Sequence, residues 1–242
     1  MTTKAESRLP AVPWGPAGVA KGVAVAGVVI VALAVGLRLG GQWAGGSLRA
    51  SPLTTTLLVL VQDLLLVAAL WAFGVRRGGW RSLGLRGFKA QRGCGLALGV
   101  LPASFTFNIL YAIVVIVVLR LPYKPQAFLP LFGGGLAGFV AALVAAVVIA
   151  PLAEEAFFRG FVFAGLRQRL GVVGAVLVSA AVFGAVHLDL ATFLPVAFLG
   201  LLLTLLYEAT GSLYPSIIAH ACNNGFGLLL AYLLELSGMA VR

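Results

Sequence analysis

The chain has 242 residues, of which 61% are hydrophobic and 10% charged, and its formal net charge is +10. A soluble domain carries about 25% charged residues because its surface faces water, so this composition excludes a water-soluble globular protein. The Lys and Arg residues flank long uncharged runs instead of forming one basic surface, which argues against a nucleic-acid partner.

Most of the uncharged runs are near or above the roughly 20 residues that a helix needs to cross a bilayer. The first follows Lys4, Arg8 and Lys21 and resembles a signal peptide, but no clear cleavage site follows it, so we expect an uncleaved span. A break near 133–135 or at Pro151 would add one further span. The sequence therefore predicts an all-α polytopic transmembrane bundle of about seven to eight spans in a single domain, residues 1–242. The uncharged runs cover residues 22–37, 93–119, 125–153, 170–188, 190–207 and 209–234, and residues 51–75 make another candidate span that is interrupted only by Asp63.

The basic residues predict the topology, because short cytoplasmic loops carry an excess of Lys and Arg. The loop at 76–92 is the most basic of the chain, so we expect this loop and the N-terminus to be cytoplasmic, together with the turn at 167–169. Arg is preferred over Lys, and Ala, Gly, Val and Leu are abundant, as in a GC-rich bacterial gene. We therefore expect the bacterial inner membrane. The cations of the loop are Arg76, Arg77, Arg81, Arg86, Lys89 and Arg92.

Ionisable side chains inside a span cost about 2.5–3.5 kcal/mol each on insertion scales, so each is a candidate functional residue. In the segment PLAEEAFFRGF, Glu155 and Arg159 are four positions apart and can pair on one helix face. Glu154 lies about 100° further round the helix and is left free for chemistry. Asp63 belongs to no motif, and we expect it to be a buried partner of a hydroxyl or an Arg.

The two histidines of the chain both fall in apolar surroundings. A hairpin that turns near residue 170 or 171 places Glu154 and His187 about 24 Å from the turn, each on its own helix. We therefore expect these side chains to stand level on adjacent antiparallel helices. Phe183 precedes His187 by four positions and is expected to pack beside it.

The second histidine, His220, lies in the last run. Asn224 follows it by four positions, so both side chains project from one face of that helix, whereas Asn223 is turned away by about 100°. We expect His220 and Asn224 to meet Glu154 and His187 in the cytoplasmic half of the bilayer.

These groups predict hydrolysis of an amide bond. A carboxylate and an imidazole can hold a water molecule and take its proton, and an imidazole and an amide can donate to a developing oxyanion. A zinc site is the alternative, because Glu154, His187 and His220 make a three-ligand set with an open fourth position. The spacing does not choose between these two sites, and it is the resemblance described next that favours direct activation of water, which requires no cofactor. Neither Cys94 nor Cys222 is placed to act as a nucleophile or to join a metal cluster.

Three motifs resemble those of the CPBP family, which includes the Rce1-like CAAX proteases and the Abi proteins. Residues 154–159 are similar to its EExxxR motif, residues 183–187 to FxxxH and residues 220–224 to HxxxN. The segment 82–86 also resembles a recurrent family segment. We therefore expect a catalytic core at about 128–236.

The resemblance implies an intramembrane endopeptidase of the glutamic or the metallo type. It implies that Glu154 and His187 activate water and that His220 and Asn224 form the oxyanion site. Glu155 and Arg159 would then have supporting roles.

The hypothesis we prefer is a protease that cuts a membrane-associated peptide or protein within the lipid bilayer, including C-terminal processing. A bacterial source makes a prenylated substrate less attractive.

Two other functions use the same residues. One is a non-catalytic membrane binding or immunity protein that keeps the motifs as a buried polar network. The other is a transporter that uses Asp63, Glu154 and the histidines as an ion relay.

Overall fold

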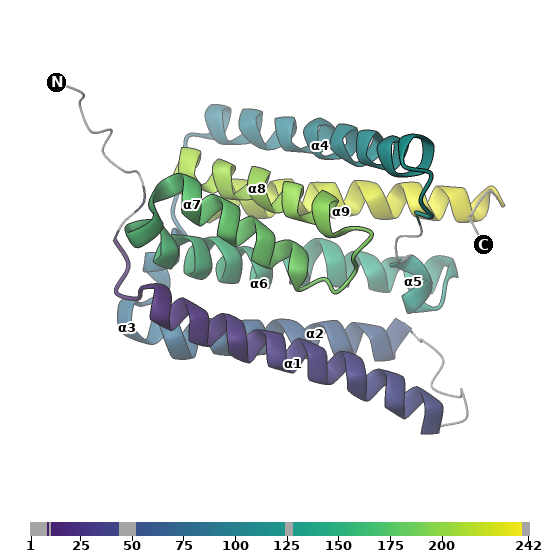
Figure 1. Ribbon diagram of the computed structural model, residues 1–242, viewed down its shortest axis with the longest axis horizontal. Coiled ribbons are helices and arrows are strands. Elements are labelled where there is room, and N and C mark those ends of the chain that lie inside the picture. The colour runs from purple at the N-terminus through teal and green to yellow at the C-terminus, as the bar shows by residue number, and fades with distance from the viewer. Residues whose placement is uncertain (1–8, 10, 44–51, 124–127, 239–242) are drawn as a thin grey trace.

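The computed structural model describes residues 9, 11–43, 52–123 and 128–238. This part of the chain is helical and contains no strand, which confirms the all-α prediction. Six helical stretches are long and apolar enough to cross a membrane, and they lie lengthwise beside one another (Figure 1). The chain is an integral membrane protein. The stretches are Pro16–Gly36, Leu53–Gly78, Ala90–Val118, Gly135–Ala185, Phe193–Thr210 and Leu213–Leu236.

The elements follow one another along the chain with short 3-10 and π-helical segments, marked η, between the α-helices. The N-terminal half contains α1 (Pro16–Trp43), α2 (Pro52–Leu70), η1 (Trp71–Val75), α3 (Arg76–Gly78), η2 (Trp80–Leu83), α4 (Ala90–Ile113) and η3 (Val114–Val118). The C-terminal half contains η4 (Leu129–Phe132), α5 (Gly135–Leu143), η5 (Val144–Ile149), α6 (Ala150–Glu155), η6 (Ala156–Phe163), α7 (Ala164–Ala185), α8 (Phe193–Thr210) and α9 (Leu213–Leu236).

The fourth stretch folds back on itself at Gly171, whose backbone (φ 68°, ψ 180°) is not helical. Glycine suits this conformation because it has no Cβ. The later part of α7 then returns beside η6 (Figure 1), so the predicted hairpin is confirmed. This turn adds one crossing to the six stretches, in agreement with the number of spans expected.

Pro151 lies inside the same stretch without ending it. A proline lacks the N–H and clashes with the carbonyl four residues earlier, here that of Val147. Val147 belongs to the π-helical η5, and the wider turn accommodates the ring. Gly135 is the first residue of α5, so the glycines at 133–135 precede this stretch and do not divide it. Neither the break expected there nor the one expected at Pro151 therefore adds a further span.

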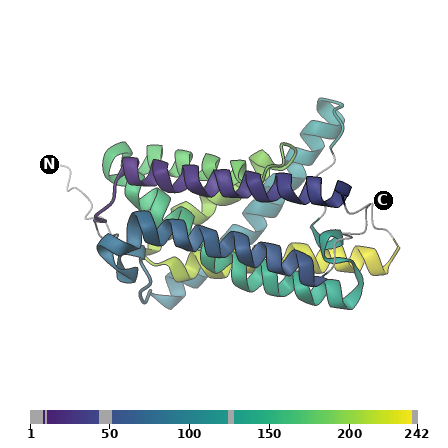
Figure 2. The same ribbon diagram turned by 90° about the horizontal axis from the view of Figure 1, so that it is seen from below.

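The helix that contains α6 lies inside the bundle. It packs against α2 on one side and α9 on the other. α1 and α2 form one flank, and α4 forms the opposite flank (Figure 1). Figure 2 shows α4 crossing the other helices at a steep incline, and it contacts α8 and α9.

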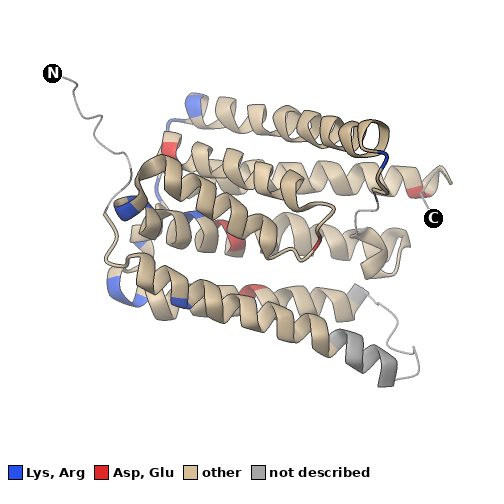
Figure 3. Ribbon diagram, in the orientation of Figure 1, with Lys and Arg blue, Asp and Glu red and all other residues tan. Residues whose placement is uncertain are grey.

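Basic residues gather at one end of the bundle. Figure 3 shows them at α3, at the start of α4 and at the turn within α7. The loop at 76–92 and the turn at 167–169 therefore share one side, as predicted. Lys4 and Arg8 lie outside the described residues, and the assignment of this end to the cytoplasm stays a prediction.

The basic loop is fixed to the turn between α8 and α9. The Tyr207 hydroxyl donates to the Leu83 carbonyl (2.9 Å), and Arg86 Nε donates to the Gly211 carbonyl (2.7 Å). Gly84 has φ +81°, and a Cβ at this position would lie 2.7 Å from the Tyr207 hydroxyl oxygen. The close approach therefore requires glycine.

We expect Gly84→Ala to lower the melting temperature of the protein in detergent. A residue with a Cβ costs about 1–2 kcal/mol in left-handed backbone, and the clash also displaces Tyr207. Gly87→Ala is the matched control, because a Cβ there has no neighbour within 4 Å. Equal melting temperatures for the two variants would contradict the role of this contact.

Candidate active site

Glu154, Glu155 and Arg159 lie where the fourth stretch passes from α6 into the π-helical η6. Turns of this kind are rare and are often found at functional sites. Glu155 and Arg159 are fully buried, and the side chain of Glu154 is 12% exposed. The helix therefore brings two carboxylates and one guanidinium into the interior of the bundle.

Glu155 and Arg159 form the ion pair that their spacing predicted. Arg159 Nη1 donates to Glu155 Oε1 at 2.8 Å, and both side chains are 0% exposed. Arg159 Nη2 donates to the Gly200 carbonyl on α8 (3.1 Å), and the guanidinium lies 4.5 Å from the centre of the Phe183 ring. A buried charge needs such partners, because an unpaired one costs several kcal/mol.

His220 lies between the two neighbouring carboxylates. Its Nδ1 is 2.8 Å from Glu155 Oε1, and its Nε2 is 3.8 Å from Glu154 Oε2. Because an ionised carboxylate can only accept, Nδ1 carries the hydrogen of this bond, which turns Nε2 toward Glu154. Glu154 and Glu155 thus point to opposite edges of one ring. We expected His220 to meet Glu154, but the sequence did not predict its bond to Glu155.

Asn224 lies on the same face of α9 as His220, as predicted. Its Nδ2 donates to the Ala146 carbonyl in η5 at 2.9 Å. An amide nitrogen has two hydrogens, so one remains for another acceptor. Asn223, which the spacing turned away, has a buried side-chain oxygen without a hydrogen-bond partner among the described residues. No motif or spacing in the sequence indicated this burial.

His187 lies just beyond the end of α7. Its Nδ1 is 2.8 Å from the Phe183 carbonyl, and its ring centre is 5.0 Å from that of Phe183, so the expected packing of these two residues is confirmed. The Phe183 ring also lies close to His220, since the centres of these two rings are 5.7 Å apart. Within the described residues, no hydrogen bond or ion pair joins His187 to Glu154.

The register of the hairpin accounts for this separation. Ser179 Oγ donates to the Phe158 carbonyl (3.1 Å), a pairing that sets Phe183, and not His187, opposite Glu154. The π-helical η6 lies in the arm that carries Glu154, and its bonds span five residues, so this arm rises less than 1.5 Å per residue. His187 therefore lies about one helical turn deeper than the equal spacing suggested.

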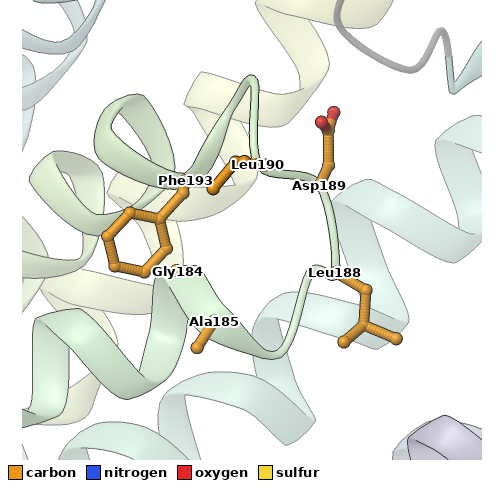
Figure 4. A pocket seen from close by; sticks show the side chains of 6 residues that line it. All are labelled: Gly184, Ala185, Leu188, Asp189, Leu190 and Phe193. Carbon is orange, nitrogen blue, oxygen red and sulfur yellow. The ribbon is translucent and has the colours of Figure 1, made fainter.

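Two pockets of the described surface are lined by residues next to His187 in the sequence, and the carboxylates of the site line neither of them. One is lined by Gly184, Ala185, Leu188, Asp189, Leu190 and Phe193. Figure 4 shows the loop from α7 to α8 around it, with the Asp189 side chain directed away from its centre. A second, apolar pocket lies between α1 and α7 and includes Val186 and Leu188.

The residues of the proposed zinc set do not converge on one point. Glu154 and His220 approach each other, but the described residues contain no group of three His, Cys, Asp or Glu side chains that could hold a metal ion. Cys94 and Cys222 are free and exposed.

Asp63 is a residue whose environment the sequence did not predict. It is 3% exposed, and neither carboxylate oxygen has a hydrogen-bond partner among the described residues. The hydroxyl or Arg partner that we expected is therefore not found in this part of the chain. No motif contains Asp63, so only its burial could have indicated its importance.

Comparison with known proteins found a family whose model matches the segment of the chain that contains the residues of this site. Residues 136–226 match the family described as type II CAAX prenyl endopeptidase, Rce1-like. The "Putative membrane peptidase YdiL" of Bacillus subtilis (strain 168) is 30% identical over 88 residues, which are 36% of this chain and 36% of that protein. The chain thus matches little more than a third of the length of this relative. No solved structure matches the chain.

We expect Arg159→Gln to destabilise the protein strongly, because it leaves the Glu155 charge buried without its partner. Breaking a buried pair in this way typically costs about 3–5 kcal/mol. The measurement is thermal unfolding in detergent, with the exposed Arg169→Gln as control. The double variant Glu155→Gln, Arg159→Met should recover part of the loss. A double variant less stable than Arg159→Gln alone would contradict the pairing.

Proposed function

We propose that the chain is an intramembrane endopeptidase, because residues 136–226 match the family described as type II CAAX prenyl endopeptidase, Rce1-like. It hydrolyses a peptide bond in a membrane-associated peptide or protein. The observation that carries the proposal is the approach of Glu154 Oε2 to His220 Nε2, with the Glu155 and Arg159 pair behind the imidazole.

The separation of 3.8 Å suits one water molecule between the two atoms. Such a water lies within hydrogen-bond reach of both, since these bonds span about 2.6–3.2 Å. With Nδ1 protonated toward Glu155, the Nε2 of a neutral ring is an acceptor. The water then donates one hydrogen to Glu154 and the other to His220, which leaves its lone pair free to attack a carbonyl carbon.

Hydrolysis proceeds in two steps around Glu154. As the water oxygen bonds to the carbonyl carbon, its proton passes to Glu154, and the carbonyl becomes an oxyanion. When the carbon–nitrogen bond breaks, Glu154 returns the proton to the leaving amine, so the carboxylate is regenerated. The second N–H of Asn224 is the available donor for the oxyanion, because the first is bonded to Ala146.

His187 completes the site on the other face of Phe183. Its Nδ1 donates to the Phe183 carbonyl, so the Nε2 of the neutral ring is an acceptor. The resemblance assigns His187 to the water. Because His220 is the imidazole beside Glu154, we propose instead that His187 accepts a hydrogen bond from the backbone N–H of the substrate.

The substrate class follows from the surroundings of the site. We propose a peptide with a lipid or apolar anchor, because the pockets beside His187 are bordered by membrane-spanning helices and one of them is apolar. We further propose that the basic end of the bundle faces the cytoplasm across a bacterial inner membrane.

We expect Glu154→Gln to lower kcat by about 10²–10⁴-fold, because glutamine cannot accept the proton of water. The probe is a quenched fluorescent peptide that ends in a farnesylated Cys-a-a-X sequence, compared with palmitoylated and unlipidated versions, in proteoliposomes. Glu235→Gln is the matched control, because that carboxylate is exposed and bonds to the Gly135 N–H far from the site.

The melting temperature of Glu154→Gln should stay near that of the wild type, because Glu154 Oε2 has no hydrogen-bond partner to lose among the described residues. Cleavage that survives Glu154→Gln unchanged would remove Glu154 from the mechanism. If the wild-type protein binds these peptides but cleaves none of them, the chain is a binding protein and not an endopeptidase.

The two nitrogens of His220 can be separated by a pair of substitutions. An asparagine retains a polar atom near Nδ1, and a glutamine retains one near Nε2. We expect His220→Asn to keep its bond to Glu155 and thus a higher melting temperature, and to lose more kcat than His220→Gln. The opposite order in kcat would show that Nε2 does not contact the reacting water.

A further inference from the structure

The connection between α7 and α8 stops short of the face of the bundle opposite its basic end. After its turn at Gly171, α7 runs to Ala185 over about 21 Å, and the 18 residues of α8 cover about 27 Å. The hydrocarbon core of a bilayer is about 30 Å thick. α9 starts from the same basic end, its 24 residues cover about 36 Å, and Figure 1 shows it extending well beyond this connection. The connection at 186–192 therefore lies at membrane depth.

The backbone of this connection is irregular. Residues 186–192 are not helical, and Leu188 has φ +54°, a left-handed conformation that is uncommon for a residue with a Cβ. The Asp189 carboxylate accepts a hydrogen bond from the Ala191 N–H (2.9 Å), as in a turn. Lipid offers no partner to the polar groups of such a backbone. Irregular backbone therefore occurs at membrane depth only where it is buried in protein or lines a cavity filled with water.

The connection is not buried in protein. His187 and Leu188 are exposed, and Leu190 is 89% exposed. The pocket that contains Asp189, shown in Figure 4, has a volume of about 280 Å³ and is bordered by this connection. Of the two ways in which a membrane protein can accommodate irregular backbone, the exposure of these side chains leaves the cavity filled with water.

The bundle is closed between the site and its basic end. The Leu83 side chain is fully buried against Gly160, where an added Cβ would lie 3.1 Å from it. Tyr207, which is also fully buried, donates to the Leu83 carbonyl. Gly160 follows Arg159 on the way to the basic end, so this layer lies between the ion pair and that end. A peptide that arrived from the basic end would have to displace the layer.

We propose that the connection at 186–192 is the floor of an aqueous recess on the face opposite the basic end, and that the substrate reaches the site through this recess. The peptide passes the exposed His187 before it reaches Glu154 and His220. Entry of a substrate rests on the proposed function, whereas the recess itself follows from the fold. With the basic end in the cytoplasm, as proposed above, the substrate is a peptide segment presented on the outer face of the membrane.

Cysteine labelling tests the recess without any substrate. In a background of Cys94→Ser and Cys222→Ser, Leu190→Cys places a thiol in the recess. Val28→Cys is the matched control, because Val28 is 70% exposed and lies about 18 Å along α1 from its start at Pro16. A charged methanethiosulfonate reacts with the thiolate, which forms in water and not in hydrocarbon, so we expect Leu190→Cys in proteoliposomes to react about tenfold faster or more. Equal rates for the two variants would overturn the proposal.

A double variant of Leu190→Cys and Gly87→Cys determines the side on which the recess opens. Gly87 lies in the basic loop, and a Cβ there has no neighbour within 4 Å, so the substitution fits the fold. In sealed proteoliposomes, an impermeant reagent should reach one of the two thiols of each molecule, whichever way the molecule is inserted, and both thiols once the vesicles are opened. Mass spectrometry counts the labels. Molecules with two labels in sealed vesicles would contradict a recess on the face opposite the basic end.

The peptide probe described above tests entry of the substrate. We expect a bulky hydrophilic maleimide, attached to Leu190→Cys before reconstitution, to abolish cleavage because it fills the recess. The same reagent on Gly87→Cys should leave kcat/KM unchanged. Cleavage that survives modification of Leu190→Cys would overturn entry by this route. If the unmodified protein cleaves none of the peptides, the proposed function fails and entry of a substrate fails with it, whereas the labelling pattern still decides the recess.

Discussion

The arrangement of the site depends on one constraint, which is that a charge inside a membrane-spanning bundle must be neutralised there. Arg159 and Glu155 satisfy it together, at 2.8 Å and with no exposure to solvent. The pair then determines its surroundings, because the guanidinium bonds to the Gly200 carbonyl and lies over the Phe183 ring, while the carboxylate orients His220. Four helices thus meet at one ion pair. Replacing such a pair by apolar residues is often neutral or stabilising, so its retention indicates that it serves position more than stability.

Two adjacent glutamates acquire different chemistry from this constraint. Glu155 Oε1 accepts from both Arg159 and His220 and is held in place. Glu154 is partly exposed, and its Oε2 has no hydrogen-bond partner in the described part of the chain. A base that takes a proton from water needs an oxygen free to do so, whereas the residue that orients an imidazole needs to be fixed. The same residue type therefore serves both purposes, and the difference lies in the partners.

The sequence predicted those features of the site that depend on local geometry. The pairing of Glu155 with Arg159 follows from a four-residue spacing within one helix. The depth of His187 did not follow, because the prediction assumed 1.5 Å per residue in both arms of the hairpin, and one arm contains a π-helical segment. The approach of His220 to both glutamates brings together two helices that are far apart in the sequence. Residue spacing within one helix cannot predict such a contact. Asp63 matches no motif, so its importance emerges only from burial without a partner.

The unpaired oxygens define the part of the bundle in which proton chemistry can occur. Around the site they belong to Asp63 on α2, to Glu154 and Glu155 on α6 and to Asn223 on α9, and α6 packs against both of the other helices. Buried polar groups are normally satisfied, by protein or by ordered water, so unpaired groups on three neighbouring helices mark an interior that water can enter. The two pockets beside His187 lie outside this interior, and one of them is apolar. The Phe183 ring lies against both histidines and the guanidinium, so it belongs to the polar interior and not to the pockets. A peptide bond that is to be hydrolysed here must therefore pass from surroundings that suit an apolar anchor to a site that retains water.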